Sequence, residues 1–455
     1  MPRSGRHATV CRRRTSHWAR RTSHWARGAD SQFEWRRHDK SGCAPPDPRS
    51  FPEAGGRGYG YFVINIRGNQ ISSRVLGPLL LFLGTLLLTT AVAVPLALVP
   101  RLKVVPLDLD ITTVATSNPA GLTSNDEVPA RVFDRCSVNE PKLRVFDAHL
   151  TQQRRTVAID PSDQDQVTLQ SAQTVVIDRV RDDAEIVAVD LGEQDAKRPC
   201  GDGLLASSVD IVSLDRRTSE PNGQLHQLHT VPVPTGVEAK DSLDTSIDAP
   251  RDGFQYHFGF DIEHGGTYPY YDVNSRSDQP ARFVGETTIN GLHALEFVSE
   301  VPEVDQTQLA TPSGFPALGS SIEMPAKWWG IRGPGVDPEE KVLMHRYGTA
   351  TRRVWIEPKT GTVLYGSEDQ HQYFKSPGWE DPSLAQPIRD FRVDALNTTM
   401  SWTDSTVEQQ TSRAGEYIDQ LRIGNVIVPW TAGIVGAVLA GAGVFLTFRA
   451  ARRRS

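Results

Sequence analysis

The side chains best suited to ligand binding are aromatic, and many of them gather in one segment. The stretch Phe254–Tyr271 holds seven aromatic residues, and a spacing of two from residue 254 to residue 260 would place four of them on one face of a strand. Such a face is either part of a hydrophobic core or the lining of an apolar ligand cleft, and both interpretations stay open. The candidate lining residues are Phe254, Tyr256, Phe258, Phe260 and Tyr270.

A second segment of interest places two tryptophans side by side. Pro312–Pro338 contains ten Gly or Pro among 27 residues and includes Trp328 and Trp329. This composition predicts a long irregular loop, and long loops with apolar residues are often functional. We expect at least one of the two rings to be exposed or to face a cleft, where it would contact lipid or gate the cleft. The alternative is a loop that packs on the core.

Motifs of catalysis are absent from the sequence. It lacks the G-x-S-x-G, H-E-x-x-H and Walker A patterns of hydrolases, metalloproteases and nucleotide-binding proteins. His257, Asp261 and His264 have a spacing that would suit metal ligands on a helix, but the residues around them resemble strand and loop. We therefore predict no enzyme activity, no cofactor and no metal site.

Two apolar segments frame the region that holds these residues. Segment 75–99 and segment 423–448 contain no charged side chain, and about 20 apolar residues are enough to cross a bilayer. Both are predicted to be transmembrane helices. Between them we predict an external β-rich domain at 101–402 and a juxtamembrane helical stalk at 403–422, with Asp404 as its N-cap.

The second segment carries a row of small residues. Gly433, Ala437 and Gly441 are spaced by four, so they lie on one face of a helix. Small residues at this spacing allow two membrane helices to approach closely. The row is therefore a predicted helix-packing face.

Charge is distributed unevenly along the chain. Residues 1–74 hold fifteen basic and five acidic side chains, residues 101–422 hold thirty and fifty, and the tail 449–455 holds four arginines. Because Lys and Arg near membrane spans remain on the cytoplasmic side, we predict a two-pass protein of the cell membrane with both termini cytoplasmic. The large domain would then be external or periplasmic. Cys136 and Cys200, its two cysteines, are predicted to form a disulfide in that oxidising compartment.

The first 74 residues differ in character from the rest. RTSHWAR occurs twice in tandem, at 14–20 and 21–27, and a stretch rich in Gly and Pro follows. We expect either a disordered, basic cytoplasmic leader or a translation start further along, for example at Val63 or Val75. We do not expect nucleic-acid binding, although the leader is basic.

The external region is predicted to be mainly β. Alternating apolar and polar residues recur between turn signals, and Asn290-Gly291 marks a two-residue hairpin of type I′. A second hairpin is expected around residues 357–361. The fold class is therefore a membrane-anchored β-sandwich or partly closed barrel between two transmembrane helices.

Several motifs resemble those of a known family. They are RLKVVPLDLDITT at 101–113, TYPYYD at 267–272, PARFVGETTINGLHALEF at 280–297 and RRVWIEPKTGTVLYGSEDQHQYF at 352–374. Together with the two spans, they resemble the actinobacterial envelope membrane proteins of the "porin PorA family", a family with a domain of unknown function, over about residues 70–450.

The resemblance implies a membrane-anchored protein that binds or helps to traffic lipids or glycolipids for a mycolate-type cell envelope. Its expected partners are membrane lipids or envelope glycolipids and an envelope-lipid exporter. The alternative is a structural scaffold that recruits partners without a lipid ligand. Porin activity is not expected, because two apolar helices already anchor the chain and the outer region is strongly acidic.

Overall fold

The structure is a computed structural model that describes residues 73–117, 127–182, 185–189, 203–229, 246–311, 314–317 and 319–452. The predicted leader, its tandem repeat and Cys200 lie outside the described residues, so the disulfide with Cys136 stays a prediction. Cys136 itself is buried in a short 3-10 turn, η2 (Arg135–Asn139).

One antiparallel sheet contains all fifteen strands found in the described residues. Its main path runs β8-β7-β6-β4-β3-β1-β15-β14-β13-β11-β10-β9, while β2, β5 and β12 pair beside it. The strand β1 therefore lies between β3 and β15, the latter from the far end of the chain. The bounds are β1 Asp110–Thr116, β2 Ala130–Phe133, β3 Val145–Ile159, β4 Gln166–Asp182, β5 Glu185–Ala188, β6 Leu204–Asp215, β7 Pro221–His229, β8 Ser246–Asp248, β9 Thr267–Asp272, β10 Ser277–Ile289, β11 Leu292–Asp305, β12 Ser321–Pro325, β13 Lys341–Ile356, β14 Val363–Lys375 and β15 Val393–Trp402.

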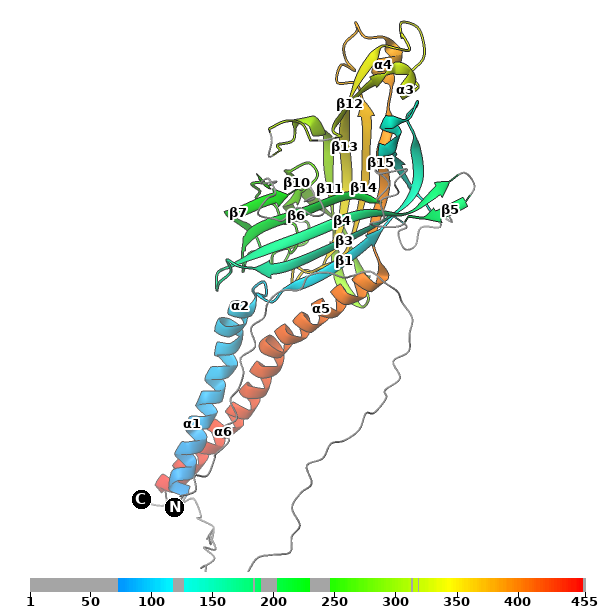
Figure 1. The fold of residues 1–455 in the computed structure, drawn as a ribbon. Helices are drawn as coiled ribbons and strands as arrows, with labels where there is room; N and C mark the ends of the chain where they lie inside the picture. Colours follow the sequence, from blue (N-terminus) through cyan, green and yellow to red (C-terminus); the bar gives the residue numbers. More distant parts are fainter. Residues whose placement is uncertain are drawn as a thin grey trace, which may run out of the picture. The chain divides into compact units, whose positions relative to one another are not determined.

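The sheet curls into a partly closed ring (Figure 1). Register shifts interrupt several of its strand pairs, and such bulges bend strands and increase their twist. The two edges then pack together: Leu228 of β7 and Ile247 of β8 share a core cluster with Tyr271 of β9. Across the same junction, the guanidinium of Arg251 lies 3.8 Å from the centre of the Tyr271 ring. The predicted mainly-β, partly closed architecture is confirmed.

Both predicted hairpins are present. Asn290 and Gly291 have φ of 47° and 83° between the paired residues Ile289 and Leu292, as a type I′ turn requires. The second hairpin joins β13 to β14 at residues 357–361, where Gly361 has a φ of 71°. A Cβ at Gly361 would also meet the carbonyl oxygen of Phe258 at 2.2 Å, so no larger residue fits there.

The helices lie mainly at the two ends of the chain. Two helical runs, Val75–Leu102 and Asp404–Arg452, are long and apolar enough to cross a membrane. The second run starts as a polar helix, α5, and continues through a π turn into an apolar helix, α6. The helix bounds are α1 Ser73–Ala93, η1 Val94–Leu98, α2 Val99–Leu102, η3 Gln306–Gln308, α3 Ala326–Trp329, α4 Gln386–Asp390, α5 Asp404–Arg422, η4 Ile423–Ile427 and α6 Val428–Arg452.

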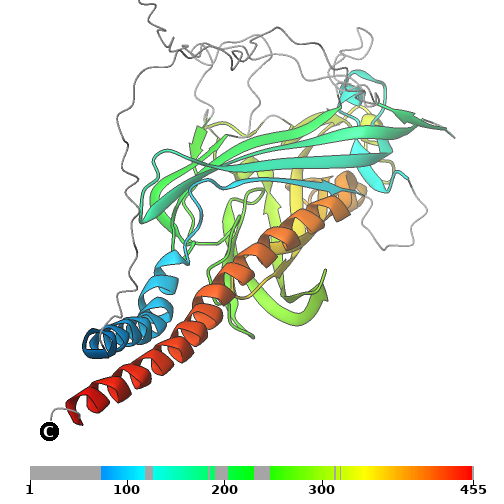
Figure 2. The same ribbon diagram turned by 90° about the horizontal axis from the view of Figure 1, so that it is seen from below.

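The helix α5 packs on the sheet as well as linking it to a candidate membrane span. Thr403, and not the predicted Asp404, is its N-cap, because the Thr403 hydroxyl accepts a hydrogen bond from the backbone N–H of Thr406. Thr406, Gln410 and Ala414 form the buried face, one helical turn apart. The view from below shows α5 running beneath the strands and continuing into α6 (Figure 2).

The helices α1 and α6 pack along each other through glycines. A Cβ on Gly84 of α1 would lie 2.4 Å from the backbone nitrogen of Ala440, and one on Gly436 would lie 2.9 Å from the carbonyl oxygen of Gly84. Gly443 makes a similar approach to Leu81. Close backbone contact of this kind is what small residues permit in membrane helices.

The predicted packing row does not form this contact, and its packing on another helix stays a prediction. A Cβ on Gly441 would have no neighbouring atom within 4 Å, and Ala437 is exposed. Gly433 reaches only the edge of the contact, where a Cβ would lie 3.8 Å from Ala91. The two helices meet at a different face, so Ala437 and Gly441 point away from α1.

This difference gives a matched test of the helix contact. We expect Gly436→Leu to weaken the packing of α1 on α6, with a cost of about 1–3 kcal/mol, because the added atoms have no space. Gly441→Leu should change little. Thermal unfolding of the full chain in detergent measures both effects. An equal loss of stability in the two variants would contradict the observed helix face.

Candidate functional site

A cavity of about 310 Å³ lies inside the curled sheet. Its walls come from neighbouring strands β1, β3, β13, β14 and β15, from Tyr270 of β9 and from the segment 255–257. The helix α5 completes the lining with side chains on successive turns, among them Gln410, Arg413 and Tyr417. The cavity is therefore bounded on one side by the helix that continues into the candidate membrane span.

The lining is mixed in character. Apolar side chains come from Ile111 of β1, Val363 of β14 and Met400 of β15, whereas Arg154 and Glu368 contribute charge. The interior is thus neither a hydrophobic tunnel nor a solid core. A volume near 300 Å³ lies at the lower end of ligand pockets, and a few polar groups among apolar ones are typical of such sites.

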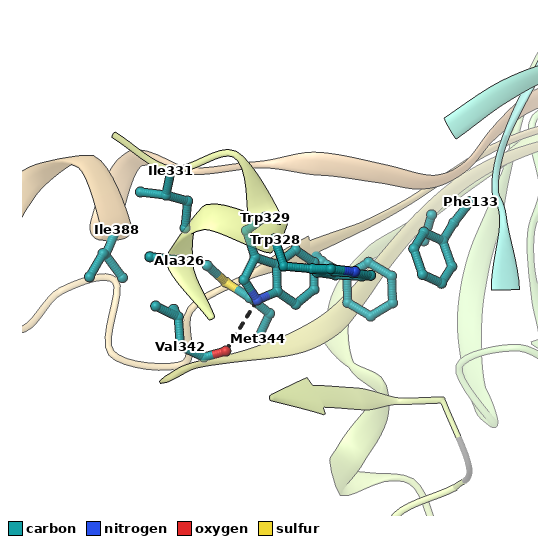
Figure 3. Packing of buried hydrophobic residues seen from close by; sticks show 10 residues of the cluster. Phe133, Ala326, Trp328, Trp329, Ile331, Val342, Met344 and Ile388 are labelled. Carbon is teal, nitrogen blue, oxygen red and sulfur yellow. Dashed lines mark hydrogen bonds between the residues drawn. The ribbon is translucent and has the colours of Figure 1, made fainter. Parts of the chain in front are cut away.

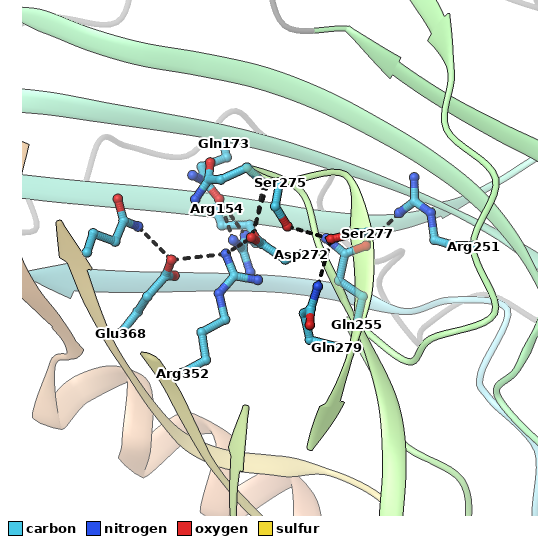
Figure 4. A network of polar contacts seen from close by, with 12 residues as sticks. Arg154, Gln173, Arg251, Gln255, Asp272, Ser275, Ser277, Gln279, Arg352 and Glu368 are labelled. Carbon is cyan, nitrogen blue, oxygen red and sulfur yellow. Dashed lines mark hydrogen bonds and ion pairs between the residues drawn. The ribbon is translucent and has the colours of Figure 1, made fainter. Parts of the chain in front are cut away.

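A buried arginine organises the charged part of the wall (Figure 4). Arg352 Nη2 lies 2.8 Å from Asp272 Oδ1 and 3.0 Å from Glu368 Oε1, and Gln370 Nε2 donates to the same Glu368 oxygen at 2.8 Å. Burial alone would lower the pKa of Arg352, but the carboxylates of Asp272 and Glu368 raise it, so the guanidinium stays charged. The cluster therefore holds a fixed positive charge between two fixed carboxylates.

A second buried ion pair supports the aromatic part of the wall. Both terminal nitrogens of Arg251 contact Asp210, at 2.7 and 2.6 Å, and the Tyr256 hydroxyl donates to Asp210 Oδ2 at 2.7 Å. Burial, and then the charge of Asp210, raise the pKa of Tyr256 well above its usual value. Tyr256 therefore remains a neutral hydrogen-bond donor that is fixed in place.

The neighbouring His257 is held neutral. Burial lowers its pKa to about 4, although a hydrogen bond with the Phe258 carbonyl acts in the opposite direction. Its Nδ1 lies 2.5 Å from that carbonyl oxygen and 3.1 Å from the hydroxyl of Ser219. At neutral pH, this side chain adds polarity to the cavity but no charge.

The prediction of a strand at 254–260 is wrong, but two of the five predicted lining residues do line the cavity. Residues 254–260 form no regular strand, apart from one bridge between Phe254 and Tyr270. Phe254 and Phe258 stack at 5.1 Å inside a core cluster that also contains Tyr270, so they serve as core. Of the five candidates, Tyr256 and Tyr270 line the cavity, whereas Phe260 is half-buried outside it.

The two tryptophans are buried, against our prediction (Figure 3). Trp328 is 3% exposed and Trp329 is 2% exposed, in a core cluster at the end of the sheet away from the cavity lining. The segment is also more regular than predicted, because it contains β12 and the single helical turn α3. On a helical turn neighbouring side chains diverge, so the rings meet edge to face, with centres 4.8 Å apart and both inside the core.

Each indole N–H in this cluster is satisfied. Trp328 Nε1 donates to the carbonyl oxygens of Ser137 and Glu140, at 3.1 Å each, and Trp329 Nε1 donates to that of Val342 at 3.2 Å. Neither ring contacts the cavity. Their role is packing, and the lipid-contact hypothesis for this loop does not apply.

The possible metal ligands in the sequence are separated in the structure. His257 bonds to Ser219, Asp261 pairs with Lys103 at 2.5 Å, and His264 lies 3.4 Å from Glu286. The three side chains therefore have different partners and do not form one site.

The charged lining residues were missed by sequence reasoning, although a signal was present. Arg352 alternates with Val354 and Ile356 along β13, so it occupies an inward-facing position among buried apolar residues. A charged residue at such a position requires buried partners. The α5 residues carried no comparable signal, because only the fold brings that helix to the sheet.

Comparison with known proteins supports the family suggested by the motifs. The family model described as Porin PorA matches residues 76–445. A protein named "Porin PorA" from Corynebacterium amycolatum is 26% identical over 387 residues, covering 80% of this chain and 96% of the relative. Another "Porin PorA", from Corynebacterium resistens, is 27% identical over 433 residues, covering 84% and 98%. The matched region contains the described cavity, the whole sheet and most of both apolar helices, and the chain belongs to the Porin PorA family of membrane proteins.

Proposed function

We propose that this chain is a membrane-anchored envelope protein that binds the polar head of a lipid or glycolipid in the cavity beside α5. The observation that carries the proposal is the shared helix: α5 supplies Gln410, Arg413 and Tyr417 to the cavity and runs on into the candidate span α6. A lipid whose tails remain in the bilayer could reach a site beside this helix with its head.

The chemistry of the lining favours a hydroxylated head over an acyl chain. A hydrocarbon chain in this space would remove the remaining solvation of the Arg352–Glu368 pair and would offer it no further hydrogen bond. Hydroxyl groups can both donate and accept, so they suit a wall that presents guanidinium, carboxylate, amide and phenol groups together. The tyrosine rings add apolar faces for the carbon skeleton.

The proposed role is to hold or pass on such molecules in a mycolate-type envelope, next to an envelope-lipid exporter. It requires both termini to be cytoplasmic and the sheet to be external, as the flanking charges predict. It assigns no catalytic step to the chain. The relatives carry the name porin, and channel activity is one outcome that the following test can detect.

A cavity-filling substitution tests the proposal. Thr113 lines the cavity from β1, whereas Thr112 lies on the opposite face of the same strand. We expect Thr113→Phe to weaken the binding of a lipid or glycolipid by about tenfold, equal to about 1.4 kcal/mol, and so to lower the fraction of chain that co-purifies with it. Thr112→Phe should leave that fraction unchanged. Native mass spectrometry of the full chain, extracted in detergent from its own membrane, gives the fraction directly.

Other outcomes of this experiment separate the alternatives. Wild-type chain without any bound lipid would refute the proposal and favour the scaffold. That alternative has its own support, because Ala437 and Gly441 of the small-residue row are exposed on the side of α6 away from α1, where a partner helix would pack. Ion conductance of the purified chain in a planar bilayer, abolished by Thr113→Phe, would instead favour a porin.

A further inference from the structure

Three side chains with metal-binding chemistry converge on the surface of the hairpin β10–β11. Glu286 belongs to β10 and His293 to β11, diagonally across the two-residue turn. His264 comes from the segment that precedes β9. Their three ligand atoms all lie within 4.8 Å of one another. None of the three side chains lines the cavity described above.

The distances match the geometry of a small metal site. His293 Nε2 lies 3.0 Å from Glu286 Oε2, and His264 Nδ1 lies 3.4 Å from the same oxygen. Zinc binds imidazole nitrogen at about 2.0–2.1 Å and carboxylate oxygen at about 2.0–2.2 Å, so ligand atoms in a tetrahedral site are separated by roughly 3.4 Å. The remaining distance, between the two imidazole nitrogens, is at most 4.8 Å, so side-chain rotation would bring the three groups around one ion.

The surroundings favour metal binding over a closed salt bridge. The side chains of His264, Glu286 and His293 are 60, 56 and 48% exposed, so an ion can reach them from solvent. The two imidazole rings stack with centres 5.7 Å apart and planes 24° apart, which places two imidazoles beside one carboxylate. The positive-φ turn at Asn290 and Gly291 fixes the hairpin that carries two of the ligands.

We propose that His264, Glu286 and His293 bind a divalent transition metal, with Zn²⁺ as the best-matched ion. Two imidazole nitrogens and one carboxylate oxygen form a ligand set that is neither strongly hard nor strongly soft, and such a set suits zinc. Three protein ligands leave a fourth position for water. The metal would join the hairpin to the segment 254–266, which also carries Tyr256 and His257 of the cavity wall. The site does not depend on the proposed ligand of the cavity.

Calorimetric titration of the full chain with ZnCl2 tests this site. The protein is purified in detergent without a polyhistidine tag and stripped with a chelator. We expect one equivalent of Zn²⁺ to bind the wild type, and His264→Ala, His293→Ala and Glu286→Gln each to weaken binding by at least about tenfold. His371→Ala is the matched control, because His371 is 45% exposed and pairs with Asp394 at 2.9 Å as an ordinary surface pair. It should leave the affinity unchanged.

A spectroscopic measurement with Co²⁺ gives a second readout of metal binding, and circular dichroism checks folding separately. Co²⁺ in a four-coordinate site of nitrogen and oxygen ligands gives a visible absorption band, which should appear with the wild type and with His371→Ala only. Circular dichroism confirms that each variant is folded, and His293→Gln replaces His293→Ala if the latter is not. The proposal is overturned if the wild type binds no Zn²⁺ up to 100-fold excess, or if folded variants at the three positions bind as tightly as the wild type.

Discussion

Replacing Trp328 by alanine is expected to lower the free energy of unfolding by about 3–5 kcal/mol. The ring is almost fully buried, lies edge to face with Trp329, and packs near Phe133 with ring centres 6.4 Å apart. Truncation would leave a large void and would also remove the donor that both Ser137 and Glu140 carbonyls accept from. The same range is expected for Trp329→Ala, whose ring contacts Phe374 and Phe391.

Chemical denaturation of the full chain in detergent, followed by circular dichroism, measures this loss. Phe315→Ala is the matched control, because Phe315 belongs to the same Gly- and Pro-rich segment but is 75% exposed. It should change stability by less than about 0.5 kcal/mol. If Trp328→Ala were as mild as Phe315→Ala, the indole would not be part of a core, and the lipid-contact role for this loop would return.

The second large effect is expected at the cavity wall. Arg352→Met should lower the free energy of unfolding by about 3–5 kcal/mol, because it leaves Asp272 and Glu368 without their buried counter-charge. Asp272 is almost fully buried and cannot turn to solvent. Methionine approximately fills the space of the arginine stem, so the loss would come from charge and hydrogen bonds more than from a void.

The neighbouring arginine provides the control for this substitution. Arg353 follows Arg352 in β13 but is exposed, so Arg353→Met should be nearly neutral. Thermal and chemical unfolding of both variants under the same conditions gives the comparison. Equal stabilities for Arg352→Met and the wild type would show that the carboxylates find other partners, and the charged wall would then not be fixed by Arg352.

Local signals in the sequence predicted most of the fold. The Asn290-Gly291 turn, the five-residue turn before Thr362 and the two uncharged segments each depend on a few neighbouring residues, and all are present as expected. Their physical basis is backbone conformation or hydrophobicity over a short window. Features of that kind can be recognised without knowing what packs against them.

The errors have a common physical origin in contacts between distant segments. Spacing by two suggested a strand at 254–260, but the chain bends there because Phe258 and Ile262 bond to the turn around Gly361 and Pro358. The Gly- and Pro-rich composition suggested an exposed loop, yet a single turn at Ala326–Trp329 places both indoles inside. No local pattern reveals such packing.

The cavity was also beyond local prediction. Its lining comes from strands far apart in the chain, and its position depends on how strongly the sheet curls. Arg352 alone carried a readable signal, as a charge among inward-facing apolar residues. The grouping of His264 with Glu286 and His293 was beyond local prediction for the same reason, because the three residues come together only after the hairpin has formed.

The place of β1 in the sheet has a consequence for biosynthesis. Ala115 of β1 pairs with Trp402 of β15, so one edge of the first strand finds its partner only when the last strand has been made. At about 5–20 residues per second, a ribosome needs roughly 15–60 s to cover that interval. Such distant pairing also slows folding through its high contact order, and an unpaired strand edge can template aggregation in the meantime. Completion of the sheet is therefore tied to the end of translation, just before the second span emerges.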